Sequence, residues 1–168
     1  LGQLESPDIL RALRDSHPEV RRRAVMLAES RLDSAEIETA VLGLVQDPQL
    51  AVRCQVALSL GAPNDPLVAS NLIRLAAKDG DDPWMRIAIL SSLNTGADAL
   101  LKLILEPENA QSALPSPAFI KQLAYLVGAN STEYSVLSTL NQLAQPGLSI
   151  DSLLPLVSGL GEGLSRKK

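Results

Sequence analysis

Residues capable of nucleophilic, acid–base or metal chemistry are few and scattered in this chain of 168 residues. His17 and Cys54 are its only histidine and its only cysteine, so the chain alone forms neither a His/Cys zinc site nor an internal disulfide. Cys54 lies in a helical pattern between Arg53 and Gln55, which predicts a packed or half-buried thiol. His17 precedes Pro18 in a predicted turn, where a polar ring needs no functional explanation.

The carboxylates also lack the partners that catalysis requires. The pairs Asp81–Asp82 and Glu36–Glu38 fall in turns or on polar helix faces, with no histidine or apolar cleft indicated nearby. Asp79, Asp81 and Asp82 are the candidate metal ligands, but their loop lacks the ligand spacing of a calcium-binding hand. We favour solvated turn carboxylates, and predict no catalytic, cofactor-binding or metal site in this chain.

The pattern Gly159-x-Gly161-x-Gly163 is superficially similar to a glycine loop that binds a nucleotide. The dinucleotide-binding pattern has a different spacing, follows a strand and opens a helix. Here a helix comes first and no strand is predicted. We therefore expect these glycines to terminate a helix.

Trp84 and the run Arg21-Arg22-Arg23 are the candidates for contact with another macromolecule. Trp84 follows Pro83 at a helix start, where it is either an exposed anchor for a partner or, as we favour, a side chain packed at a turn. The net charge of −4 and a pI near 5.0 disfavour a nucleic-acid surface, which needs a basic face. We interpret Arg21 as a residue of the repeat and the other two arginines as solvated side chains on a helix face.

The elements that must position these residues repeat along the chain. An apolar residue followed by arginine recurs at intervals of 32 and 33 residues, in Val20-Arg21, Val52-Arg53 and Met85-Arg86. The positions one before, three after and seven after each arginine are apolar in every copy. A period of this length indicates an array of helix pairs that bury their faces against their neighbours.

Apolar spacing, prolines and capping residues such as Asp65, Asp82 and Gly61 predict the helices, and no strand is predicted. The helices are expected at about Ser6–Arg14, Glu19–Arg31, Ser34–Gln46, Pro48–Gly61, Pro66–Lys78, Pro83–Asn94, Asp98–Glu106, Ala118–Val127, Thr132–Ala144 and Ile150–Leu160. A loop with three prolines is expected at Pro107–Pro117. Pro155 is expected to kink or divide the last helix.

The second half of the chain carries little charge. Between Ala110 and Ser165 the charged residues are Lys121, Glu133, Asp151 and Glu162. This composition indicates surface that packs on something outside the chain. We interpret residues 1–168 as a single repeat domain excised from a longer protein, with regular repeats over about 6–94 and degenerate ones over about 95–163. No apolar run approaches the 20 or so residues of a membrane span, so we expect no direct membrane insertion.

The aspartates six residues before Arg21 and Arg53, the turn prolines and the helix Val52–Gly61 resemble HEAT repeats of the short bacterial class, over about Ser6–Asn94. The resemblance implies an all-α fold, a right-handed α-α superhelix (a HEAT/armadillo-like solenoid) of about five helix pairs. It also assigns five residues to a structural ladder that joins neighbouring repeats: Asp15, Arg21, Asp47, Arg53 and Arg86. In the third repeat either Asp79 or Asp81 can supply the aspartate.

A second resemblance runs through the motifs Asp82–Arg86, Leu90–Leu93, Phe119–Gly128 and Gly159–Leu164. Their succession is similar to the HEAT segment of large bacterial proteins classed as membrane-bound dehydrogenases. In those proteins a sugar-dehydrogenase-like propeller precedes the helical array and a c-type haem domain follows it, which implies an extracytoplasmic or periplasmic location. Neither Cys-x-x-Cys-His nor a propeller signature occurs here, so this chain is assigned neither activity.

These observations favour a non-catalytic scaffold or protein–protein interaction module, whose partner is another protein or a neighbouring domain of the same chain. Exposed residues of the second helices, such as Arg22, Arg23 and Gln55, are the expected contacts. The alternative is a structural linker that joins the dehydrogenase-like and haem domains. A third class, an enzymatic HEAT-like array such as a bilin lyase or a DNA-alkylation repair glycosylase, is the least supported. The glycosylase would need a basic groove with aromatic residues.

Overall fold

The computed structural model describes residues 5–61, 65–93, 96–106, 114–143 and 150–166. All regular structure in these ranges is helical, so the prediction of an all-α helical-repeat fold is confirmed. The chain divides into two compact units, residues 1–61 and 62–168, and each is described by itself. A single domain over 1–168 stays a prediction.

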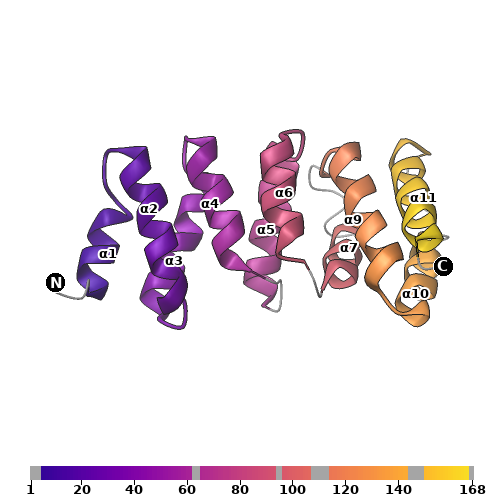
Figure 1. Cartoon of the computed structure of the whole chain (residues 1–168), viewed down its shortest axis with the longest axis horizontal. Coiled ribbons are helices and arrows are strands. Elements are labelled where there is room, and N and C mark those ends of the chain that lie inside the picture. The colour runs from indigo at the N-terminus through magenta and orange to yellow at the C-terminus, as the bar shows by residue number, and fades with distance from the viewer. Residues whose placement is uncertain (1–4, 62–64, 94–95, 107–113, 144–149, 167–168) are drawn as a thin grey trace. The chain divides into compact units, whose positions relative to one another are not determined.

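The first unit consists of two helix pairs (Figure 1). Its helices are α1 (Ser6–Ala12), α2 (Pro18–Ala28), α3 (Ala35–Gly43) and α4 (Leu50–Leu60). Short 3-10 turns, η1 (Glu29–Arg31) and η2 (Leu44–Gln46), extend α2 and α3 to the ends expected from the sequence. The first helices pack together, α1 on α3, and so do the second helices, α2 on α4. This is the stacking that a repeat array requires.

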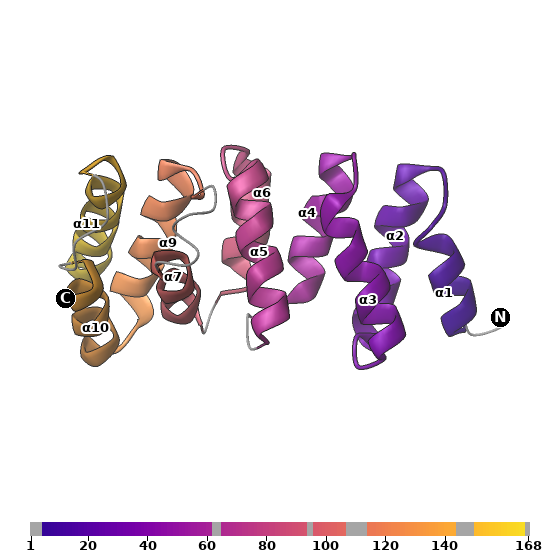
Figure 2. The same cartoon turned by 180° about the vertical axis from the view of Figure 1, so that it is seen from behind.

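The second unit continues with six described helices (Figures 1 and 2). They are α5 (Pro66–Asp79), α6 (Pro83–Ser91), α7 (Ala97–Leu105), α9 (Pro117–Asn130), α10 (Glu133–Leu143) and α11 (Ile150–Ser165). Here α6 packs against α9, and α9 against α11, so second helices again stack on second helices. Residues 107–113 of the expected proline loop, together with Asn94 and Ala144, lie outside the described residues.

Three helix boundaries follow the capping residues read from the sequence. The Asp65 carboxylate accepts a hydrogen bond from the Leu67 N–H (2.6 Å), and Asp82 accepts from the N–H groups of Trp84 (2.9 Å) and Met85 (3.0 Å). Gly61 ends α4 with φ +68°, a conformation that residues with a Cβ adopt at a cost. The caps at Asp65, Asp82 and Gly61 are therefore confirmed.

The recurring apolar positions form the core of each unit. In the first unit Ala24, Ala28, Val52 and Val56 are at most 1% exposed. Their counterparts in the second unit are also buried: Met85, Ile89 and Leu93. Two positions depart from the pattern: Val20, at the first turn of α2, is 39% exposed, and Leu60, at the end of α4, is only half-buried.

The glycines of α11 lie inside the helix and not at its end, so the prediction that they terminate a helix is wrong. The reason is the close approach of α9. A Cβ at Gly159 would overlap the Lys121 carbonyl oxygen, and a Cβ at Gly163 would overlap the Tyr125 carbonyl oxygen. Nor does Pro155 divide α11, which runs through it as one helix.

Candidate functional site

The ladder predicted from the resemblance is present within the first unit. Arg21 donates two hydrogen bonds to the Asp47 carboxylate, from Nε to Oδ2 (2.6 Å) and from Nη2 to Oδ1 (3.1 Å). This bidentate pair links the first helix pair to the turn of the second, and Asp47 is 5% exposed. Arg21 and Asp47 therefore have the structural role that the sequence assigned to them.

The ladder arginines also donate hydrogen bonds to the main chain. Nη1 of Arg21 donates to the Asp15 carbonyl oxygen (2.8 Å), and Nη1 of Arg53 donates to the Asp47 carbonyl oxygen (2.6 Å). In both cases the acceptor lies six residues before the arginine. The bond ties the turn to the helix that follows it.

The third repeat keeps the main-chain bond, and the supply of the ladder aspartate by Asp79 or Asp81 stays a prediction. The residue six before Arg86 is Gly80, and its carbonyl oxygen accepts from Nη1 of Arg86 (3.0 Å). Asp81 adds its own carbonyl oxygen (2.7 Å). In the first two turns the carboxylates of Asp15 and Asp47 each accept a hydrogen bond from the N–H group two residues later. In the third turn the carboxylate of Asp82 accepts the equivalent bond.

All three expected contact residues on the second helices have partners within the first unit. Arg22 binds both carboxylate oxygens of Glu19 (2.7 and 2.9 Å), and this hydrogen bonding lowers the pKa of Glu19 to about 2. Gln55 is 8% exposed and donates to Ser59 Oγ (3.3 Å), so the prediction of an exposed Gln55 is wrong. Arg23 also approaches Glu19 (3.3 Å), although 71% of its side chain is exposed.

The residues with chemical potential stay apart and have structural surroundings. His17 caps α2 by accepting the Glu19 N–H at Nδ1 (3.3 Å), and Cys54 is half-buried, as predicted. Within the described ranges no three His, Cys, Asp or Glu side chains gather in a way that could hold a metal ion. A search of the same ranges finds no helix long and apolar enough to cross a membrane.

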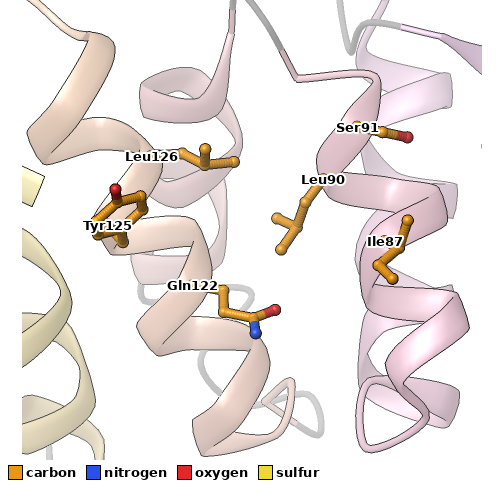
Figure 3. Close-up of a pocket in the computed structure, with 6 residues that line it drawn as sticks. All are labelled: Ile87, Leu90, Ser91, Gln122, Tyr125 and Leu126. Carbon is orange, nitrogen blue, oxygen red and sulfur yellow. The ribbon is translucent and has the colours of Figure 1, made fainter.

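An open apolar groove lies between α6 and α9 in the second unit (Figure 3). Its volume is about 330 Å³, and it is lined by Ile87, Leu90, Ser91, Gln122, Tyr125 and Leu126. Figure 3 shows Leu90 and Leu126 extending toward each other from the two helices. The groove is not predicted from the sequence, because its two walls come from helices about 30 residues apart whose packing no short motif reveals.

Trp84 extends the apolar surface of α6. Its side chain is 71% exposed, and Ile87, one helical turn later, is 56% exposed. The prediction that Trp84 packs at a turn between repeats is therefore wrong. The signal that would have found it is the spacing of three from Trp84 to Ile87, which places both residues on one side of the helix.

A second hollow, of about 320 Å³, adjoins the groove across α9. Tyr125 and Leu126 line both hollows, and the second one is completed by Ala129, Asn130 and Arg166. Nη1 of Arg166 donates a hydrogen bond to the Tyr125 hydroxyl (2.8 Å). An apolar surface and a guanidinium thus lie on opposite sides of the same two residues.

Further apolar side chains are exposed near the end of the described chain. On α11 these are Ile150, Leu154, Val157 and Leu164, at 74, 64, 57 and 39% exposure. Ile150, Leu154 and Val157 share one side of the helix, whereas Leu156 and Leu160 are buried. This surface belongs to the stretch of low charge seen in the sequence.

Comparison with known families adds one match. A family model described as HEAT repeats matches residues 6–94, slightly more than half of the chain. Neither a curated protein nor a solved structure matches. The match covers the regular repeats and gives the resemblance to membrane-bound dehydrogenases no support.

Proposed function

Because the chain belongs to the HEAT repeat family, we propose that it is a non-catalytic scaffold that binds a protein partner through the groove between α6 and α9. The observation that carries this proposal is the apolar surface formed by Trp84, Ile87, Leu90 and Leu126 on neighbouring second helices. Exposed tryptophan and large aliphatic side chains are the residues from which protein interfaces gain most of their free energy.

The shape of the groove favours a protein over a small molecule. Small-molecule sites are enclosed, bury most of their ligand and hold a few convergent polar groups. Here Ile87 is more than half exposed and the groove is open, with only the ends of Ser91, Gln122 and Tyr125 polar. Such a surface suits apolar side chains presented by another polypeptide.

The alternative is a structural linker within a membrane-bound dehydrogenase, between a sugar-dehydrogenase-like domain and a c-type haem domain. The succession of motifs from Asp82 to Leu164 supports it, as do the exposed apolar residues of α11, which a neighbouring domain would cover. A Cys-x-x-Cys-His motif encoded downstream in the full gene would favour the linker. Its absence there would count against it.

The binding proposal is tested with peptides selected from a phage-displayed random library on the purified chain. We expect Trp84→Ala and Ile87→Glu each to weaken the selected peptides at least tenfold in fluorescence anisotropy, as for residues at the centre of an interface. Leu67→Glu is the matched control, because Leu67 is 53% exposed on the first helix α5 of the same unit. Peptides that tolerate both groove substitutions would contradict the proposal.

A further inference from the structure

We infer that the partner segment presents a carboxylate beside its apolar side chains, and that Arg166 and Tyr125 bind this carboxylate. The inference rests on the proposed function of the groove and adds the chemistry of the partner. It follows from what lies on each side of α9.

The two hollows share one wall. Tyr125 and Leu126 line the apolar groove on the α6 side of α9 and the second hollow on the α11 side. A segment that places an apolar side chain between Leu90 and Leu126 therefore passes directly by Tyr125 on its way to Arg166. The apolar contact and the ionic contact are therefore adjacent, because the same two residues of α9 line both hollows.

Among the described cations of this region, Arg166 is the one available to an external anion. Among the described residues no carboxylate pairs with it, and its Nη1 donates to the neutral Tyr125 hydroxyl. The nearby Lys121 is paired instead with Glu162 (2.7 Å), and Glu162 also accepts a hydrogen bond from Ser158 (3.1 Å). Glu162 is thus neutralised and does not repel an incoming carboxylate.

Tyr125 and Arg166 form a ready pair of donors. The Tyr125 oxygen accepts from Arg166, which leaves its O–H group to donate. The guanidinium keeps its remaining N–H groups in a fixed plane, the arrangement that best matches a carboxylate. The same hydrogen bond raises the pKa of Arg166, and an arginine is cationic throughout the physiological pH range even without it.

A protein segment fits this surface better than a free fatty acid. An acyl chain needs an enclosed channel, whereas Ile87 and Trp84 continue the apolar surface in the open along α6. This extended surface matches a polypeptide that presents more than one apolar side chain. Asp or Glu near those side chains supplies the carboxylate.

The test uses the same random peptide library and the full chain. We expect peptides selected on the unaltered chain to be enriched in Asp or Glu next to their apolar residues, and peptides selected on Arg166→Gln to lack that enrichment. For one selected peptide, its Glu→Gln version should bind about fivefold more weakly to the unaltered chain, the size expected for an exposed ion pair. The two versions should bind Arg166→Gln equally.

Arg74→Gln is the matched control, since Arg74 is an exposed arginine on α5 and its loss should leave the preference for Glu unchanged. Selected peptides without acidic enrichment, or a Glu preference that survives Arg166→Gln, would overturn the inference while leaving the proposed function in place. Displacement of the peptide by micromolar decanoate would overturn it in favour of a free fatty acid. Failure to select any peptide that depends on Ile87 would remove both.

Discussion

At the scale of single residues, the ladder arginines join side-chain and main-chain hydrogen bonding in one group. Arg53 is 6% exposed and its Nη1 reaches the Asp47 carbonyl oxygen at 2.6 Å. A buried guanidinium is stabilising only while its N–H donors have acceptors. Removing the guanidinium of Arg53 would also take this hydrogen bond from the Asp47 carbonyl oxygen. The ladder therefore acts on the turn and on the helix together.

We expect Arg53→Ala to lower the free energy of unfolding by about 1–3 kcal/mol, the range for breaking a buried charged hydrogen-bond network. Chemical denaturation followed by circular dichroism measures the change. Arg14→Ala, which removes an exposed arginine in the same unit, should change it by less than about 0.5 kcal/mol. Equal denaturation midpoints for the two variants would contradict a structural role for Arg53.

The pH dependence of stability should report on Asp47. Burial opposes ionisation of this carboxylate, but hydrogen bonds from Arg21 and from the Gln49 N–H outweigh burial, and the pKa of Asp47 lies below its ordinary value of 3.8. A lowered pKa in the folded state gives stability that is present above the ordinary value and is lost as the pH falls through the folded pKa.

We therefore expect the unaltered chain to lose stability as the pH falls below about 4, and Asp47→Asn to lose less over the same interval. Thermal unfolding at a series of pH values makes the comparison. At neutral pH the Asn variant should be the less stable of the two, because Arg21 then lacks its charged partner. Parallel pH profiles would show that Asp47 does not contribute through its charge.

At the scale of elements, α9 and α11 form an unusually close helix pair because glycines remove the side chains between them. Gly163 on α11 lies against the Tyr125 carbonyl oxygen and the main chain near Ala129. Gly161, two residues before it, has no neighbour within 4 Å of the position a Cβ would take. The two glycines are thus chemically identical and differ only in surroundings.

This contrast gives a matched pair of substitutions. Gly163→Ala should lower the free energy of unfolding by about 1–3 kcal/mol, because main-chain atoms cannot move aside as a flexible side chain would. Gly161→Ala should instead raise it by about 0.5–1 kcal/mol, since alanine favours the helix and meets no obstacle. Differential scanning calorimetry distinguishes the two. Equal changes in the free energy of unfolding would mean that Gly163 is not required for the close packing of α9 and α11.

At the scale of the whole molecule, charge is distributed unevenly and apolar surface is exposed where charge is scarce. Leu154 and Val157 are more than half exposed on α11, in the stretch with few charged residues. Exposed apolar surface of this kind binds hydrophobic dyes and lowers solubility. It contributes little to the folded core, because that side of α11 does not face α9.

We expect the double substitution Leu154→Lys and Val157→Glu to reduce binding of the dye anilinonaphthalene sulfonate and to raise solubility. The melting temperature should change little, since exposed positions away from caps and packed contacts rarely alter stability by more than about 0.5 kcal/mol. Leu156→Lys, one residue away but 1% exposed, is the control that should unfold the chain. A large loss of stability in the double variant would show that this surface is packed.

The helices and caps could be predicted from the sequence because each rests on local spacing, whereas the pair of Arg21 and Asp47, 26 residues apart, was implied by the resemblance to HEAT repeats. Asp65 and Asp82 cap the helices that follow them, and Arg21 donates to the carbonyl oxygen of Asp15, six residues before it. The α11 glycines and the exposure of Trp84 were predicted wrongly because both depend on which helix lies opposite, and local spacing carries no such information. The groove between Leu90 and Leu126 depends on the same long-range packing.

The acceptors in the three turns also differ in whether a single substitution can remove them. The carboxylate that Asp47 offers to Arg21 is lost with one substitution, whereas the carbonyl offered by Asp15, Asp47 or Gly80 exists whichever residue occupies the position. In the third turn glycine occupies the position six residues before the arginine, and this bond is present. An array built on main-chain acceptors can therefore accumulate sequence change in its turns while its arginines hold the geometry, and an engineer who adds a repeat must specify the arginine before the aspartate.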